Sequence, residues 1–205
     1  MHNTSIKLRY YAMGRSYKET SQRLYKIAEA QQGFFTTKQA ITAGCAENIH
    51  TYHVRHGNWI REFRGIYRLA NFPLSEDSEL VLWSLWSRSR QDIPQGVYSH
   101  ETALSIHDLS DLMPSKLHLT VPLNFRRNSQ IPEVLILHRA NLKEDYIEAR
   151  QGFRVTTPLR TIIDLPKEGT VPMDIIQQAL QEAMKRGLIT RSAIRRIEIP
   201  QVVRI

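Results

Sequence analysis

The sequence lacks the features that define several large classes of protein. Its 205 residues include one cysteine, which excludes an internal disulfide framework and a four-cysteine zinc site. It has no run of about 18 apolar residues, so a transmembrane helix is excluded. Residues 1–9 lack the apolar core of a secretory signal, so we expect a cytoplasmic protein. No repeat or low-complexity tract is present, and a hydrophobic content of 41% is enough for a packed core.

Positive charge is in excess, and the excess lies at one end of the chain. The formal net charge is +8. Residues 1–72 hold 11 basic and four acidic side chains, a net +7, whereas residues 73–205 hold 17 and 16, a net +1. A basic module followed by a nearly neutral one predicts a head that binds a polyanion and a separate body. The alternative is a basic face that only confers solubility.

The basic region has the element order of a winged helix-turn-helix. Hydrophobic periodicity and helix stop residues predict helices over 21–32, 37–43 and about 46–56. Thr36 or Thr37 can cap the second helix, with a preceding phenylalanine packed against it, and Gly44 supplies the turn. Residues 1–18, which carry Lys7, Arg9, Arg15 and Lys18, are interpreted as a basic arm or an additional helix.

The third predicted helix has a polar face suited to the edges of DNA bases. At 100° per residue, Asn48, Thr51, Tyr52 and Arg55 fall on one side, opposite Ala46, Ile49, His50 and His53. Arginine can bridge guanine, asparagine can bridge adenine, and a threonine methyl can contact thymine. We therefore expect this helix to enter a major groove, the alternative being an ordinary solvated face.

A β-hairpin is predicted after the third helix. Two β-prone runs, 59–63 and 66–69, flank Arg64 and Gly65, and the glycine permits the positive φ that the turn requires. Strand alternation would place Arg61 on the aromatic face of the hairpin unless a bulge intervenes. Arg64 is the best candidate for phosphate contact. The complete set of predicted DNA-binding residues is Thr37, Lys38, Asn48, Thr51, Tyr52, Arg55, Arg61, Arg64 and Arg68.

The remainder of the chain predicts a body of mixed α/β (α+β) class. Residues 1–72 form the winged helix-turn-helix domain, 73–96 a linker with a connecting helix over 79–89, and 97–205 the α/β domain. In this last domain we expect strands at 116–121, 133–138 and 153–157, and helices at 100–107, 158–165, 173–186 and 191–197. Ser99 is expected to cap the first of these helices, and Arg160 can pair with Asp164 at i, i+4.

The sequence predicts no metal site, cofactor or active site. His50, His53 and His56 would turn through about 600° on a helix and not converge, so we expect them to be buried or partly buried. The remaining candidates, His100, His107, His118 and His138, lack a cysteine or an acidic companion at ligand spacing and are interpreted as structural. Cys45 has no acid to complete a triad, and there is no phosphate-binding loop, so we expect no catalytic residues and no enzyme activity.

Several segments of the sequence resemble one family. They are LYKIAEAQQGFFTTKQAITAG, RHGNWIREFRGIYRLANFP, YSHETALSIHDLSDLMPSKLHLTVP, LHRANL and GFRVTTPLRTIIDL, which together cover roughly residues 22–165. In order and spacing they resemble the AbiE-type (abortive infection) antitoxins. That resemblance implies a bacterial type IV antitoxin whose N-terminal domain binds inverted repeats in promoter DNA and represses its own operon. It also implies that the C-terminal domain counteracts a nucleotidyltransferase toxin without forming a stable complex.

Two other functions fit the sequence. One is a one-component transcription regulator whose second domain senses a ligand or a protein, and the other is a protein-interaction module that uses the winged helix for docking. The third helix has Arg55 as its one permanently charged cation, so phosphate attraction is expected to come mainly from the arm and the hairpin. The oligomeric state and the operator sequence are left open by the sequence.

Overall fold

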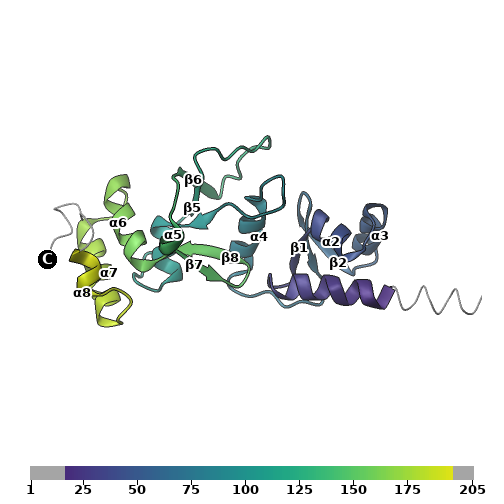
Figure 1. Ribbon diagram of the computed structural model, residues 1–205, viewed down its shortest axis with the longest axis horizontal. Helices are drawn as coiled ribbons and strands as arrows, with labels where there is room; N and C mark the ends of the chain where they lie inside the picture. The colour runs from purple at the N-terminus through teal and green to yellow at the C-terminus, as the bar shows by residue number, and fades with distance from the viewer. Residues whose placement is uncertain (1–16, 196–205) are drawn as a thin grey trace, which may run out of the picture. The chain divides into compact units, whose positions relative to one another are not determined.

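The computed structural model describes residues 17–195, which fall into two compact units. The first unit is Met1–Pro94 and the second is Gln95–Ile205. Each contains one sheet, of three strands in the first unit and five in the second, together with helices (Figure 1). The predicted mixed α/β class is confirmed. None of the helices described between residues 17 and 195 has the length and apolar character needed to traverse a lipid bilayer.

The first unit follows the predicted order of helix, short helix, turn, helix and hairpin. A helix runs from the first described residue to residue 29. It is followed by β1 (Phe34–Thr36), α2 (Thr37–Ala43), the 3₁₀ turn η1 (Glu47–Ile49), α3 (His50–Arg55), β2 (Trp59–Phe63) and β3 (Ile66–Leu69). The three strands are antiparallel in the order β1-β3-β2, and β1 is an addition to the predicted elements.

Local chemistry accounts for the position of α2. The Thr36 side chain accepts a hydrogen bond from the Gln39 backbone, and the Gln39 side chain accepts one from the Thr36 backbone, which completes a capping box. Gly44 then ends the helix in the left-handed conformation. One apolar cluster holds the helices to the sheet and contains Leu24, Ala28, Phe35, Ala40, Ala43, Cys45 and Trp59.

The segment expected as a linker and connecting helix, 73–96, lies almost entirely in the first unit. Its helix is α4 (Ser78–Trp86), with Val81, Leu85 and Trp86 fully buried. After the helix, Arg88 pairs with Asp92 at 3.1 Å, and the Asp92 carboxylate also accepts a short hydrogen bond from the Thr36 hydroxyl. These contacts join the end of the segment to the start of α2.

The second unit is built on a mixed sheet. The strands are β4 (Val97–Tyr98), β5 (Leu117–Val121), β6 (Leu135–Arg139), β7 (Ile147–Arg150) and β8 (Phe153–Thr156), in the order β6-β5-β4-β8-β7. The β5–β6 and β4–β8 pairs are parallel, and the other two are antiparallel. The three predicted strands are present within two residues of their expected ends, whereas β4 and β7 had not been predicted.

The helices of this unit are α5 (His100–Ile106), α6 (Pro158–Glu168), α7 (Met173–Lys185) and α8 (Arg191–Arg195). Leu104, Ile162 and Leu180 belong to one apolar cluster that joins α5, α6 and α7 (Figure 1). Residues 196 and 197 of the last predicted helix lie outside the described residues. Ser99 stands at the N-cap of α5, but its side chain makes no capping hydrogen bond, which corrects that prediction. Its hydroxyl instead accepts from Thr120 at 2.7 Å.

Candidate functional site

The predicted third helix is divided into two parts. Glu47–Ile49 is a 3₁₀ turn, and the α-helix begins at His50, so Asn48 lies on the turn before α3. Asn48, Thr51, Tyr52 and Arg55 are nevertheless all exposed, whereas His50 and His53 are buried. Ala46 and Ile49 were expected on the side opposite the polar face and are exposed as well, because Ala46 is extended and precedes the turn, and the tighter winding of the 3₁₀ turn changes the direction of Ile49.

Two buried histidines fix the orientation of α3. His53 stacks on Trp59 with ring centroids 4.5 Å apart, and the His50 Nε2 lies 3.1 Å from the carbonyl oxygen of Cys45. Burial lowers the pKa of His53, and the charges of His50 and His56 lower it further. The expectation of burial is confirmed for these two residues and is wrong for His56, which is exposed. The His50 and His53 rings act as core side chains, and the opposite face of the helix is left to solvent.

The exposed face carries an ordered aromatic side chain. Tyr52 packs against His56 with ring centroids 3.9 Å apart, and the His56 Nδ1 lies 2.9 Å from the Tyr52 carbonyl oxygen. The Tyr52 side chain still has 55% of its surface exposed. Tyr52 therefore presents an aromatic ring, which His56 holds in place, and a hydroxyl group beside Thr51 and Arg55.

The hairpin contains a bulge, and it separates Arg61 from Phe63 but not from Trp59. The register of β2 against β3 shifts between Arg61 and Phe63, and Arg61 is exposed. Arg64 is exposed in the turn, beside Gly65 with φ 71°. The Arg61 and Arg64 side chains are therefore both accessible to a ligand.

The hairpin turn lies directly against the start of α2. The backbone N–H of Thr37 donates to the Gly65 carbonyl at 3.1 Å, and the Arg88 guanidinium donates to the same oxygen at 3.3 Å. The exposed Lys38 ammonium donates to the Arg90 carbonyl at 2.5 Å. Thr37, Lys38 and Arg64 are thus brought together. The exposed Arg90 joins them, and the sequence had placed it in a linker.

Arg68 was predicted to contact DNA, and the structure corrects that prediction. Its side chain is buried, with the Nε 2.7 Å from a carboxylate oxygen of Glu62, and Nη1 donates to the Phe72 carbonyl at 2.8 Å. The β3 pairing turns residue 68 inward, where the ion pair satisfies its charge. The arm residues Lys7, Arg9 and Arg15 lie outside the described residues.

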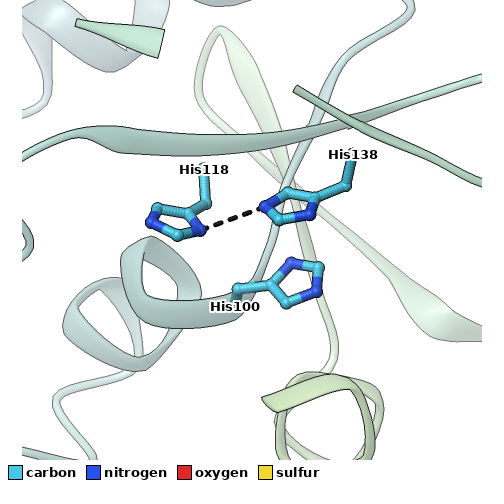
Figure 2. Close-up of side chains that lie close together, drawn as sticks. All are labelled: His100, His118 and His138. Atoms are coloured by element: carbon cyan, nitrogen blue, oxygen red, sulfur yellow. Dashed lines mark hydrogen bonds between the residues drawn. The ribbon is translucent and has the colours of Figure 1, made fainter. Parts of the chain in front are cut away.

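Three histidines meet in the second unit. His118 on β5 and His138 on β6 lie on one face of the sheet, with His118 Nδ1 3.1 Å from His138 Nε2 (Figure 2). His100, the first residue of α5, stacks on His138 with ring centroids 3.8 Å apart. One nitrogen of each ring lies within 4.8 Å of the others. We refer to these three residues as the histidine cluster.

Two carboxylates flank the histidine cluster, which corrects the expectation that these histidines lack acidic companions. Glu168 Oε1 lies 3.2 Å from His138 Nδ1 and 3.8 Å from His100 Nε2. Glu101 Oε2 lies 3.9 Å from His118 Nε2. The five residues come from two strands and two helices, so only the neighbouring pair His100–Glu101 could have suggested the site from sequence.

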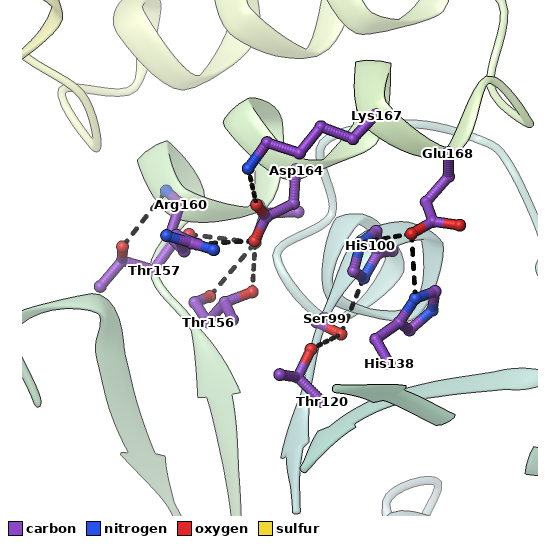
Figure 3. Close-up of polar contacts among 11 residues, drawn as sticks. Ser99, His100, Thr120, His138, Thr156, Thr157, Arg160, Asp164, Lys167 and Glu168 are labelled. Carbon is purple, nitrogen blue, oxygen red and sulfur yellow. Dashed lines mark hydrogen bonds and ion pairs between the residues drawn. The ribbon is translucent and has the colours of Figure 1, made fainter. Parts of the chain in front are cut away.

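One side of the histidine cluster faces an open pocket of about 510 Å³. Arg160, Asp164 and Lys167 line it together with His100 and His138 (Figure 3). The predicted Arg160–Asp164 pair is confirmed, with Nε 2.6 Å from the carboxylate, and Lys167 binds the other carboxylate oxygen at 2.8 Å.

Burial lowers the pKa of two histidines of the cluster. Desolvation, followed by the charge of His138, lowers the pKa of His100 to about 4. Desolvation also lowers the pKa of His118, although the Glu101 carboxylate opposes the shift. Neutral imidazoles retain lone pairs that can accept a proton, a hydrogen bond or a metal ion.

Comparisons with known proteins agree with this architecture. A family model described as "Transcriptional regulator, AbiEi antitoxin" matches residues 22–70, from the first helix through the hairpin. The resemblance to AbiE-type antitoxins is confirmed for that segment. The chain is also similar in fold to the crystal structure of the RV2827C protein from Mycobacterium tuberculosis. The TM-score is 0.54 at 11% sequence identity, over 90% of this chain and 73% of that one. No curated protein matches the chain.

Proposed function

We propose that the protein is an antitoxin and autorepressor. Its first unit would bind inverted repeats in the promoter of its own operon as a winged helix-turn-helix, and its second unit would counteract a nucleotidyltransferase toxin. The observation that carries the proposal is that the segment matching the AbiEi family exposes Asn48, Thr51, Tyr52 and Arg55 along η1 and α3.

In this proposal, base recognition and phosphate binding belong to different parts of the first unit. Arg55 and Asn48 can form bidentate contacts with guanine and adenine in the major groove, and the Thr51 methyl can contact thymine. Lys38, Arg64 and Arg90 are exposed and would bind phosphates, which position the protein without reading sequence. Arg61 extends this basic edge along β2.

The antitoxin activity is assigned to the second unit. The segments YSHETALSIHDLSDLMPSKLHLTVP and GFRVTTPLRTIIDL, which resemble the family outside the matched domain, form β4, α5, β5, β8 and most of α6. We propose that this unit acts without catalysis of its own and without a stable complex with the toxin. The type IV mode of action is carried over from the family resemblance alone.

A separation of functions in the full chain tests the proposal. The double variant Arg55→Ala/Arg64→Ala should lose repression of a reporter fused to the upstream region. It should still rescue growth when co-expressed with the neighbouring nucleotidyltransferase gene. Lys116→Ala removes an exposed positive charge from the second unit and serves as the matched control, which should keep both activities.

Two results would redirect the proposal. If the neighbouring gene encodes no nucleotidyltransferase, or if co-expression does not restore growth, a one-component regulator with a sensing second unit becomes the better interpretation. If purified protein shows no salt-sensitive binding to the upstream DNA, the first unit is better interpreted as a protein-docking module.

A further inference from the structure

We propose that His100, His118 and His138 form a binding site for a zinc-class divalent transition-metal ion. The site lies in the second unit and is independent of the proposed DNA contacts. The three imidazoles would supply three ligands, and a water molecule or a small anion entering from the adjoining pocket would complete the coordination.

The spacing of the nitrogens is close to what a metal ion requires. Tetrahedral zinc with Zn–N bonds of about 2.0–2.1 Å holds its ligand nitrogens about 3.3 Å apart. His118 Nδ1 and His138 Nε2 are already 3.1 Å apart, and no two of the three candidate nitrogens are farther apart than 4.8 Å. Closing the site therefore requires the candidate nitrogens to approach by up to about 1.5 Å and the His100 ring to rotate out of its stack on His138, so that its lone pair points at the ion.

The fold places two ligands rigidly and holds the third in an unusual conformation. The parallel register pairs His118 with Ile136, so His138 lies two residues along on the same face of the sheet. His100 has φ 52°, a left-handed conformation that costs free energy in a non-glycine residue. A chain of hydrogen bonds orients its ring, because Thr120 donates to the Ser99 hydroxyl, which lies 2.9 Å from His100 Nδ1.

The surroundings of the two sheet histidines resemble the outer shell of a metal site. When His118 Nδ1 and His138 Nε2 face the ion, the opposite nitrogens face carboxylates. His138 Nδ1 is 3.2 Å from Glu168, and His118 Nε2 is 3.9 Å from Glu101. Metal-bound histidines commonly donate their second N–H to a carboxylate, which fixes the tautomer and makes the ligating nitrogen more basic.

The donor set selects the class of ion. Three imidazole nitrogens suit zinc and its neighbours in the first transition row, whereas magnesium and calcium prefer oxygen ligands. Three protein ligands beside an open pocket leave one coordination position for an exogenous group. The residues that line that pocket include three cations, Arg139, Arg160 and Lys167, against the two carboxylates of Asp164 and Glu168, and this excess of one positive charge would favour an anion there.

Cobalt(II) and zinc binding to the untagged full chain tests the proposal. After treatment with a chelator and its removal, one equivalent of Co²⁺ should give the visible d–d absorption of a low-symmetry site, and Zn²⁺ should abolish it. Calorimetry with Zn²⁺ should give a stoichiometry of one. His138→Gln and His118→Gln should abolish both responses. His107→Gln changes a buried histidine outside the cluster and should bind as the unaltered chain does.

A milder variant keeps the test decisive if the histidine variants fail to fold. Glu168 is 42% exposed, so Glu168→Gln is expected to leave the fold intact. It should weaken zinc binding about 10–100-fold by removing the outer-shell carboxylate. The proposal is overturned if the unaltered chain shows no saturable binding near one equivalent. It is also overturned if folded His118→Gln, His138→Gln and Glu168→Gln all bind as tightly as the unaltered chain.

Discussion

The Nε of Arg68 lies 2.7 Å from a carboxylate oxygen of Glu62, so this arginine is part of the hairpin's own structure. Arg68→Met should lower the free energy of unfolding by about 1.5–3 kcal/mol, because it removes charge-assisted hydrogen bonds and leaves Glu62 without its partner. Urea denaturation measures the change. A loss below about 0.5 kcal/mol, the range of an ordinary surface substitution, would contradict this assignment.

Arg64 differs from the buried Arg68 in that its side chain is exposed, in the hairpin turn. Arg64→Ala should leave stability nearly unchanged but weaken binding to all DNA sequences, and the slope of log affinity against log salt should become flatter by about one unit. Fluorescence anisotropy over a salt series gives both quantities. An unchanged slope would remove the hairpin turn from the phosphate-binding surface.

Arg55 should affect sequence preference more than general affinity. Its side chain lies on the exposed face of α3, where a bidentate contact with guanine is possible. Arg55→Ala should cost about 1–3 kcal/mol on the operator and little on unrelated DNA, so the ratio of the two affinities falls. Equal losses on both DNAs would instead make Arg55 a phosphate contact.

Gly33 and Gly57 both have positive φ, but an added side chain would overlap a neighbour only at Gly33. Alanine substitutions at the two positions therefore distinguish the cost of backbone strain from the cost of steric overlap. A Cβ at Gly33, with φ 90°, would lie 2.5 Å from the Phe72 ring, whereas at Gly57, with φ 70°, it would meet nothing within 4 Å. Gly33→Ala should destabilise the protein by about 2–4 kcal/mol, from overlap added to strain. Gly57→Ala should cost only the strain, about 1–2 kcal/mol. Thermal denaturation that ranks the two equally would show that Phe72 moves away without cost.

Buried His107 should make the protein less stable in acid. Its Nε2 lies 2.7 Å from the Thr156 carbonyl oxygen, and desolvation lowers its pKa despite that contact. Since the unfolded chain then binds more protons than the folded one, the free energy of unfolding falls as pH drops below about 6.5. The contribution of one such histidine is at most about 1.4 kcal/mol per pH unit.

His107→Gln should reduce that dependence. Glutamine can still donate to Thr156 but does not take up a proton, so the loss of stability between about pH 7 and pH 5 should be smaller in the variant. Urea denaturation across this range measures it. A pH dependence identical to that of the unaltered chain would mean that His107 titrates normally in the folded state.

The elements predicted well were those with a local cause. The Thr36 cap, the turn at Gly44 and the apolar periodicity of 173–185 all act over a few residues, so the sequence alone located α2 and α7. Strand β1 has three residues and β4 has two, too short for an alternating pattern to identify. Their strand conformation depends on partners that are distant in sequence.

The residues of the candidate sites were likewise predictable from the sequence only where their arrangement has a local cause. Sequence periodicity was enough to find the exposed residues of α3, because one helix turn brings them together. It could not show that Arg68 faces inward to Glu62, since the pairing of β3 with both of its neighbouring strands decides which of its side chains are covered.

The sequence by itself determined the mixed α/β class and the concentration of positive charge in the first 72 residues. Only the tertiary structure brought His100, His118 and His138 together. His118 and His138 are 20 residues apart in the chain, and only the parallel pairing of β5 with β6 sets their rings 3.1 Å apart, nitrogen to nitrogen. Local periodicity does not predict such contacts, because the register between two strands is decided by how the whole sheet packs.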